Sequence, residues 1–133
     1  MSLFLLDTNI ASHIIRQDDP RILEFAYDLP AASLVISAVT KGELIFELAK
    51  IQVHPKLAKL MREFLQTVTV LPWTDETAET YGTLKATCRA RGIGLSALDM
   101  MIAAHAVSLG ATLVSRYKAF GHIGDGLKVV DWV

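Results

Sequence analysis

Short apolar runs alternate along this chain with longer stretches in which apolar residues recur every three or four positions. Short continuous runs are typical of strands buried on both faces of a sheet, whereas the three-to-four spacing is typical of amphipathic helices. We predict strands at residues 3–6, 34–36, 68–71, 112–114 and 129–132. We predict helices at residues 10–16, 21–28, 38–51 and 97–109, one that begins at Pro55, and one that ends at Gly92 after a cap at Thr74 or Asp75.

The order of these elements predicts the class of fold. Strands that alternate with helices form parallel sheets, because each crossover connection places a helix against a face of the sheet. Residues 97–109 are apolar on nearly every side, so we expect that helix to be buried, with Ser96 at its start and Gly110 at its end. The chain is therefore predicted to be an α/β protein with a short parallel β-sheet flanked by helices on both faces. In such sheets ligands bind beyond the carboxyl ends of the strands.

Length and composition fit one ordinary globular domain, which we expect to span residues 1–133. The 13 Lys and Arg residues nearly balance the 14 Asp and Glu residues, and the net charge of −1 excludes a generally basic nucleic-acid binder but not a local basic rim. The single cysteine, Cys88, excludes an internal disulfide framework and a cysteine-based zinc cluster. The apolar runs are too short for a signal peptide or a membrane span, so we expect a cytoplasmic protein without membrane contact.

Three carboxylates lie next to predicted strand ends or helix starts. Asp7 directly follows the first strand, Glu43 lies in the second turn of the helix after the second strand, and Asp99 lies in the first turn of the apolar helix. Each also has an ordinary structural explanation: Asp7 suits a helix N-cap, and the other two acids have the capping-box spacing to a threonine or serine three residues earlier. For Glu43 that explanation is the weaker one, because Ser37 is better placed than Thr40 to cap its helix.

Taken together, the three acids indicate a metal site. Side by side at one edge of a sheet they would repel one another, and no basic residue follows Asp99 within a turn to neutralise it. Carboxylate oxygens without cysteine or a nearby histidine suit Mg²⁺ or Mn²⁺ better than zinc or copper. Such an ion is a common device of phosphoryl chemistry, because it activates a water and neutralises the phosphate.

Several short motifs carry a resemblance to a known family. They are Leu-Leu-Asp-Thr-Asn at residues 5–9, the segments 37–44, 98–106 and 112–115, and a terminal Asp131-Trp132. In this order and at these separations they resemble the PIN-domain ribonucleases, and more closely the VapC toxins of type II toxin–antitoxin systems. The resemblance covers nearly the whole chain, from about residue 3 to residue 132.

The resemblance implies a single PIN domain with Mg²⁺- or Mn²⁺-dependent endoribonuclease activity on structured RNA, commonly tRNA, which stops translation. It implies that Asp7, Glu43 and Asp99 form the metal-binding core, with Thr8 and Asn9 beside them. Members of the family usually form homodimers. A VapB antitoxin inhibits them by packing over the helices, and it often places a basic side chain in the acidic cleft. We therefore expect a homodimer and a VapB-like antitoxin as partner.

The segment after the predicted strand 112–114 departs from the family pattern. Members usually end this strand with Thr-Asn and carry a fourth acid a few residues later. Here Ser115 can replace the threonine hydroxyl, Arg116 stands where asparagine is usual, and Tyr117 stands where the acid is expected. The departure weakens the case for a second metal, and Arg116 is expected either to hold a phosphate or to pair with one of the three acids. Asp125, in a glycine-rich turn, is a weaker candidate for the site.

Other polar residues have plain structural interpretations. His105 follows Asp99 by six positions and so points to a different side of the helix, which favours a hydrogen-bonded core histidine over a catalytic base. Lys85, Arg89 and Arg91 recur at roughly helical spacing, and we favour a solvated face over a rim for phosphates. These residues are therefore left out of the predicted site.

Two rival functions are compatible with the sequence. The missing fourth acid fits a catalytically impaired PIN module that binds and titrates an antitoxin without cleaving RNA. A phosphatase of another α/β fold could use Asp7 as its nucleophile, but Asn9 stands where a second acid would support that mechanism. Metal-dependent cleavage of RNA separates the nuclease from the first rival, and turnover of small phosphomonoesters would identify the second.

Overall fold

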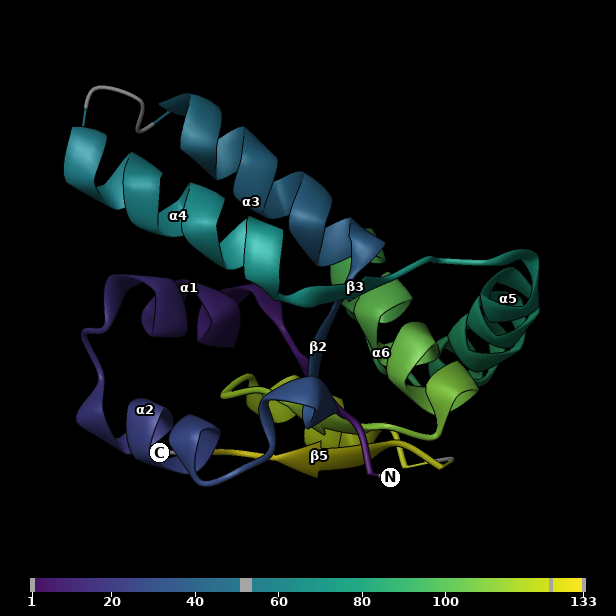
Figure 1. Cartoon of the computed structure of the whole chain (residues 1–133). Coiled ribbons are helices and arrows are strands. Elements are labelled where there is room, and N and C mark those ends of the chain that lie inside the picture. Colours follow the sequence, from purple (N-terminus) through teal and green to yellow (C-terminus); the bar gives the residue numbers. More distant parts are fainter. Residues whose placement is uncertain (1, 51–53, 125, 133) are drawn as a thin grey trace.

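A computed structural model describes residues 2–50, 54–124 and 126–132 of the chain (Figure 1). Its centre is a five-stranded sheet in which all neighbouring strands are parallel, in the order β3-β2-β1-β4-β5. The strands are β1 Phe4–Leu6, β2 Leu34–Ser37, β3 Thr69–Leu71, β4 Thr112–Val114 and β5 Lys128–Val130. The predicted α/β class with a short parallel sheet is confirmed.

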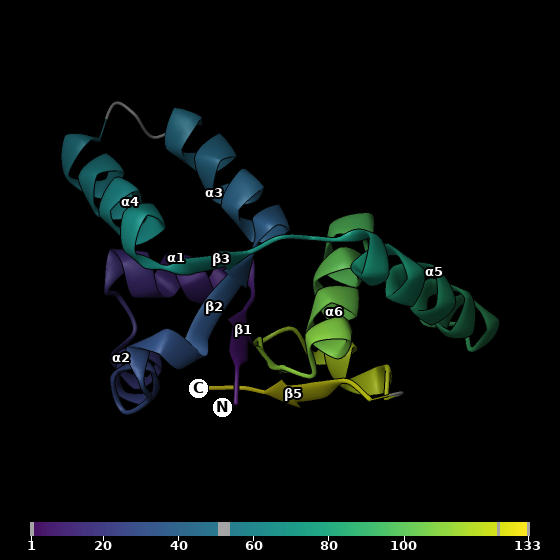
Figure 2. The same ribbon diagram turned by 45° about the vertical axis from the view of Figure 1, so that its right-hand side comes forward.

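Within the described residues, six α-helices cover the two faces of the sheet (Figures 1 and 2). One face carries α1 Thr8–Arg16, α2 Pro20–Tyr27, α3 Ala38–Lys50 and α4 Pro55–Thr67, and the other carries α5 Asp75–Ala90 and α6 Ala97–Leu109. Two short 3-10 helices, η1 Ala31–Ser33 and η2 Lys118–His122, lie in the connections. The predicted helices are confirmed, with ends that differ by up to two residues: α1 begins at Thr8 and α5 ends at Ala90. Residue 51, the last of the predicted helix 38–51, lies outside the described residues. None of the described helices is long and apolar enough to cross a membrane.

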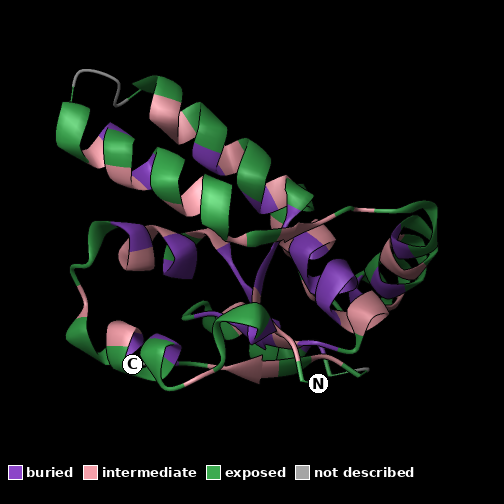
Figure 3. Cartoon of the chain, in the orientation of Figure 1, coloured by how far each residue is buried: buried purple, intermediate pink, exposed green. Residues whose placement is uncertain are grey.

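Successive residues of the central strands enter two separate cores, because side chains alternate between the faces of a strand. Leu5 and Leu113 pack into the core beneath α5 and α6. Leu6 and Val114 pack into the core beneath α1 to α4. The buried residues concentrate in these strands and in α6 (Figure 3). Burial on both faces therefore explains why the strands are continuous apolar runs.

The last strand ends earlier than the apolar pattern indicated, at Val130 in place of residue 132. Trp132 is buried, and its ring centre lies 6.3 Å from that of Phe4 and 6.0 Å from that of Phe25, on which it stacks. The run therefore stays apolar beyond the strand because its end packs beside α2.

Capping residues hold the helix starts where the sequence indicated them. Side-chain oxygens of Asp19, Thr74 and Ser96 accept backbone N–H groups in the first turns of α2, α5 and α6. Gly110 ends α6 in the left-handed conformation, at φ 65°. Helix α6 is thus fixed at both ends, which matters because Asp99 lies in its first turn.

Candidate functional site

Asp7 lies at the carboxyl end of the central strand β1. Its backbone N–H donates to the carbonyl of Val114 at 3.1 Å, so the hydrogen bonding of the sheet extends to this residue. Its side chain is buried, and Oδ1 accepts the backbone N–H of Ile10 at 2.8 Å as the N-cap of α1. The capping role is therefore confirmed, and it fixes the carboxyl group at the edge of the sheet where ligands bind.

Glu43 lies in the second turn of α3, and its side chain contacts α1. Thr8 Oγ1 donates to Glu43 Oε1 at 2.7 Å and lies 3.2 Å from Thr40 Oγ1. The backbone N–H of Val39 donates to Ser37 Oγ at 3.1 Å, so Ser37 caps the start of α3 as predicted. Glu43 is therefore oriented by a hydroxyl from another helix.

Asp99 lies half-buried in the first turn of α6, where its backbone N–H donates to Ser96 Oγ at 3.1 Å. Further along the same helix, His105 is fully buried, and its Nδ1 lies 2.8 Å from Ser37 Oγ. Burial lowers the pKa of His105. The prediction of a core histidine is confirmed, and the contact joins the helix of Asp99 to the start of the helix of Glu43.

These three acids line one cavity of about 400 Å³. They reach it from three different elements, namely the end of β1, the second turn of α3 and the first turn of α6. The structure therefore brings together the carboxylates that the sequence placed at strand ends and helix starts. The rest of the wall is formed by Thr8, Asn9, Ser12, Glu47, Ile102 and Tyr117.

Sequence reasoning missed one acid of this cavity, Glu47. It follows Glu43 by four residues, and this spacing places both side chains on one side of α3. The helical spacing alone could therefore have identified it. The cavity contains a fourth carboxylate, although Tyr117 occupies the position after β4 where the fourth acid was expected.

The negative charge of Asp7 is unfavourable in the folded protein. Burial raises the pKa of its carboxyl group, hydrogen bonds from the Ser115 side chain and the Ile10 backbone lower it, and the charges of Asp99 and Glu43 raise it again. A cation in the cavity would relieve this cost, and the hard carboxylate donors fit Mg²⁺ or Mn²⁺. In the present arrangement, no three His, Cys, Asp or Glu side chains of the described residues are close enough to hold one ion. Coordination by all three acids therefore requires their side chains to move closer together.

Two residues after β4 contact the cavity or one of its acids. Ser115 is buried, and its side chain hydrogen-bonds to Asp7. Its Oγ also accepts the backbone N–H of Tyr117 at 3.0 Å, and the Tyr117 side chain forms part of the cavity wall. The serine hydroxyl therefore contacts the first acid.

Arg116 contacts the side of the molecule formed by α1 and α2. Its Nη1 lies 3.2 Å from His13 Nε2 and 3.5 Å from Asp19 Oδ2. The expectation that Arg116 pairs with one of the three acids is therefore wrong, because Asp19 is its partner. Asp125, the weaker candidate, lies outside the described residues.

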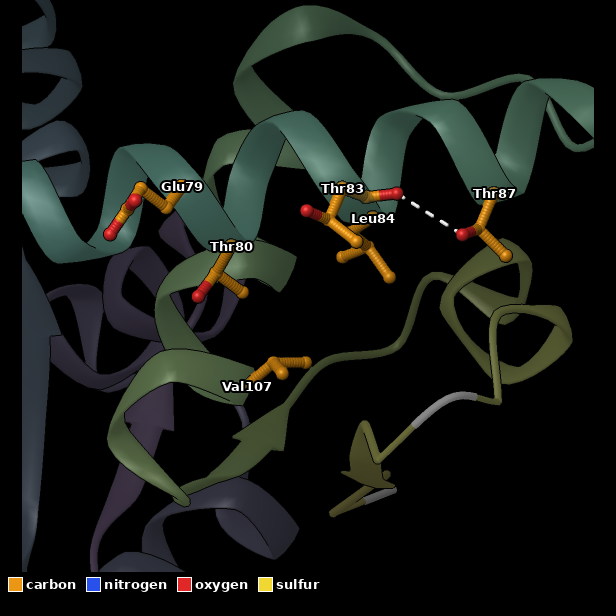
Figure 4. Close-up of a pocket in the computed structure, with 6 residues that line it drawn as sticks. All are labelled: Glu79, Thr80, Thr83, Leu84, Thr87 and Val107. Atoms are coloured by element: carbon orange, nitrogen blue, oxygen red, sulfur yellow. Dashed lines mark hydrogen bonds between the residues drawn. The ribbon is translucent and has the colours of Figure 1, made fainter.

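A separate hollow of about 610 Å³ lies between α5 and α6 (Figure 4). Threonines dominate its wall, and Glu79 is the one acid among the described residues that line it. The Thr87 hydroxyl donates to the carbonyl of Thr83 at 3.1 Å, so it satisfies its own helix. This hollow therefore lacks the convergent acids that distinguish the cavity around Asp7.

Known proteins are similar to this chain over nearly its whole length. A family model described as PIN domain matches residues 4–126. A Shigella flexneri protein named tRNA(fMet)-specific endonuclease VapC is 31% identical over 133 residues, or 99% of each chain. Ribonuclease VapC2 of Haemophilus influenzae is 30% identical over 134 residues, which is all of both chains.

Solved structures share the fold. A DNA-bound VapBC from Salmonella typhimurium matches with a TM-score of 0.89 and 27% identity, over 100% of both chains. VapBC2 from Rickettsia felis, bound to a DNA fragment from its promoter, matches with a TM-score of 0.87 and 23% identity, over 98% of this chain and 99% of that chain. The five-stranded sheet with helices on both faces is thus the fold of these proteins as well.

Proposed function

Because this chain belongs to the PIN-domain family and is a ribonuclease of the VapC type, we propose that it is the toxin of a type II toxin–antitoxin pair. As such it hydrolyses phosphodiester bonds of structured RNA with the help of Mg²⁺ or Mn²⁺. The observation that carries the proposal is the cavity in which Asp7, Glu43 and Asp99 meet from three elements. Capping and helix propensity do not require these acids to converge, whereas phosphoryl chemistry does.

The proposed ligands of the cation are the carboxylate oxygens of Asp7, Glu43 and Asp99. PIN-domain nucleases generally depend on a divalent metal, and the oxygen donors of the cavity suit Mg²⁺ or Mn²⁺. When bound, such a cation supplies positive charge that makes a water more acidic and offsets the charge of the scissile phosphate. Glu47 lines the same cavity and adds a fourth negative charge to it.

Hydroxyl and backbone groups position the acids. Thr8 holds Glu43 through the 2.7 Å hydrogen bond, and the Ser115 side chain and the Ile10 N–H hold Asp7. These contacts exist before RNA binds and keep the carboxylates at the cavity, where a bound cation would draw them closer together. We assign Thr8 and Ser115 as positioning residues.

Two further residues have proposed contacts with the substrate. Asn9 lines the cavity and offers a side-chain amide to water or phosphate. A contact between Arg116 and an RNA phosphate stays a prediction, which requires the guanidinium to leave Asp19.

The proposed substrate is structured RNA, and tRNA in particular. The relative from Shigella flexneri is named for its action on tRNA(fMet), which supports this choice. A net charge of −1 gives the protein no general attraction for a polyanion. Specificity is therefore expected to come from the shape of the RNA and from bases exposed in its loops. A tRNA substrate also implies a cytoplasmic location.

The proposed partners are a VapB-like antitoxin and a second copy of the chain. Solved structures of similar chains are named as VapBC complexes, which supports the antitoxin. The homodimer stays a prediction. Phe46 of α3 and Leu98 of α6 are large apolar side chains that are 64% and 45% exposed and line one hollow, and we expect the second copy on this surface.

The proposal is tested by incubating purified protein with unfractionated tRNA in Mg²⁺ or Mn²⁺ and mapping the 5′ ends of the products. We expect discrete cuts that disappear with EDTA and in Asp7→Asn. Asp75→Asn, which changes an exposed acid at the start of α5, is the matched control and should cut normally.

Other outcomes identify the rivals. Intact tRNA together with tight binding of a VapB-like peptide would favour the catalytically impaired module. Equal cleavage by wild type and Asp7→Asn would show that the acid cavity is not the site of cleavage. Turnover of small phosphomonoesters without RNA cleavage would favour a phosphatase.

A further inference from the structure

A second hollow borders α6, on the side of the helix away from Asp99. Its volume is about 380 Å³, and it is lined by Lys85 and Arg89 of α5, the loop 92–95, and the first turns of α6. None of the described residues that line it is acidic. We call it the basic hollow. Helices α5 and α6, which both contribute to its lining, lie side by side (Figures 1 and 2).

The two basic residues of this hollow repel each other. Lys85 and Arg89 are four residues apart on α5, a spacing at which like charges repel each other. In the part of the chain that the structure describes, neither forms an ion pair with an acid. Lys85 Nζ lies 3.4 Å from Tyr81 Oη and 5.5 Å from the centre of the Tyr81 ring. The Lys85 ammonium group therefore lies beside an uncharged side chain. An anion in the hollow would remove this repulsion.

The third basic residue of this segment holds the rim in place. Arg91 Nη1 donates to the carbonyl of Ile123 at 2.7 Å, and Nη2 donates to that of His122 at 3.2 Å. The backbone N–H of Ile93 donates to the carbonyl of Cys88 at 2.8 Å. The loop after α5 is thus attached both to its own helix and to the segment around η2. Lys85, Arg89 and Arg91 are all exposed, as the predicted solvated face requires. Two of them also line the basic hollow, and Arg91 supports its rim.

The basic hollow and the acid cavity share the first turns of α6. Asp99 and Ile102 line the acid cavity, whereas Ala97 and Met100 line the basic hollow. Opposite sides of a helix with its side chains are about 10–12 Å apart. An RNA strand with one phosphate in the acid cavity can therefore bring a neighbouring stretch of its backbone to the basic hollow, across the N-terminal end of α6.

We propose that the basic hollow binds the phosphodiester backbone of the RNA beside the bond that is cut. The proposal rests on the ribonuclease function proposed above. The acids of the cavity repel RNA, and the cation pair of Lys85 and Arg89 supplies the local attraction that a net charge of −1 does not. Contacts with phosphates fix the position of a nucleic acid without reading its bases. The hollow therefore contributes affinity and strand orientation, and it leaves sequence specificity to other contacts.

The test measures the affinity of the protein for fluorescently labelled unfractionated tRNA over a series of KCl concentrations. All proteins carry Asp7→Asn, so that the RNA is not cut. Lys85→Gln with Arg89→Gln removes the two charges of the hollow. Arg16→Gln with Lys56→Gln is the matched control, because these residues line a different hollow beside α4, on the other face of the sheet. The melting temperature of each variant shows that it is folded.

We expect the Lys85 and Arg89 pair variant to bind more weakly and to have a smaller salt dependence. Two phosphate contacts on single-stranded RNA predict a decrease of about 1.4 in the slope of log affinity against log salt, from about 0.7 for each contact. The control pair should keep the slope of its parent, as should Arg89→Lys.

The contradicting results separate the two proposals. If the wild type cuts tRNA but the slope is the same with and without the Lys85 and Arg89 pair, the basic hollow is not an RNA site and the nuclease proposal stands. The basic hollow would also be excluded as an RNA site if the slope of log affinity against log salt fell as much in the control pair as in the Lys85 and Arg89 pair variant. If no variant binds RNA and the wild type does not cut it, both proposals fail.

Discussion

At the scale of single residues, the acid cavity depends on the hydroxyl groups around it. Thr8 joins α1 to Glu43, and Ser115 joins the end of β4 to Asp7. These groups carry no charge, so they can orient a carboxylate without neutralising it. A cation can therefore still bind to the acids that they hold.

Loss of the Thr8 hydroxyl should reduce catalysis more than folding. Thr8→Val keeps the shape of the side chain but removes its hydrogen bonds to Glu43 and Thr40. We expect kcat on tRNA to fall by about 10–100-fold, as for other residues that orient metal ligands. Thr8→Ser should keep most of the activity. A Thr8→Val protein with wild-type kcat would show that Glu43 needs no positioning by this hydroxyl.

The charge of Asp7 should make stability depend on pH. Its pKa is raised above the ordinary value of 3.8 in the folded state, so the folded protein binds this proton more tightly than the unfolded chain. The corresponding stability is present below the ordinary value and is lost as the pH rises through the raised pKa. In metal-free buffer, Asp7→Asn should therefore be more stable than the wild type at neutral pH.

This difference should shrink as the pH falls toward 3.8. Asparagine keeps an oxygen that can accept the Ile10 N–H, so the cap of α1 is preserved. Urea unfolding of both proteins at several pH values measures the effect. A wild type that is the more stable protein at neutral pH would contradict the raised pKa.

The sequence allowed the three acids to be predicted, because strand ends and helix starts are visible in the hydrophobic pattern. The directions of other side chains were less predictable. Arg116 follows a strand end, as Asp7 does, yet it contacts Asp19 from a distant part of the chain. That pairing depends on how α2 packs, which local sequence does not determine.

At the scale of elements, α6 has the largest role in the site. Its first turn carries Asp99, its start is capped by Ser96, and His105 joins it to the cap of α3. An apolar helix held in this way is a rigid support for a carboxylate. The hydrophobic pattern predicted the bounds of this helix, whereas the contact between His105 and Ser37 appears only in the folded protein.

Two cap variants should distinguish the support of Asp99 from general stability. Ser96→Ala and Thr74→Ala each remove an N-cap, of α6 and of α5, and each should lower the free energy of unfolding by about 1 kcal/mol. Only Ser96→Ala should also reduce kcat on tRNA, because α6 carries an acid of the cavity and α5 does not. Equal kcat values for the two variants would show that the start of α6 does not position Asp99.

At the scale of the whole molecule, the parallel sheet explains why acids from distant parts of the sequence meet. All strands point the same way, so the residues that follow β1, β2 and β4 lie at one edge. The two cores on opposite faces of the sheet share these strands. That residues 1–133 form one domain stays a prediction, and the family model covers residues 4–126 of it.

One domain should unfold in one transition, and each of two tryptophans reports on a different core. Trp73 donates to the Met101 carbonyl at 3.0 Å and packs against Tyr81 near α5, whereas Trp132 packs in the core beneath α1 to α4. Trp73→Phe and Trp132→Phe each leave one tryptophan. In both variants, the urea-unfolding transition followed by the fluorescence of that tryptophan should coincide with the transition followed by circular dichroism. Separate transitions in either variant would indicate two independently unfolding parts.

The function proposed for the cavity requires Asp7, Glu43 and Asp99 to act together on one cation, and calorimetric titration with Mn²⁺ measures this binding directly. We expect the wild type and Glu63→Gln, an exposed acid on α4, to bind equally well. Asp7→Asn, Glu43→Gln and Asp99→Asn should each weaken binding by more than about tenfold. Wild-type affinity in any of these three variants, or no binding by the wild type, would contradict a cation site shared by the three acids.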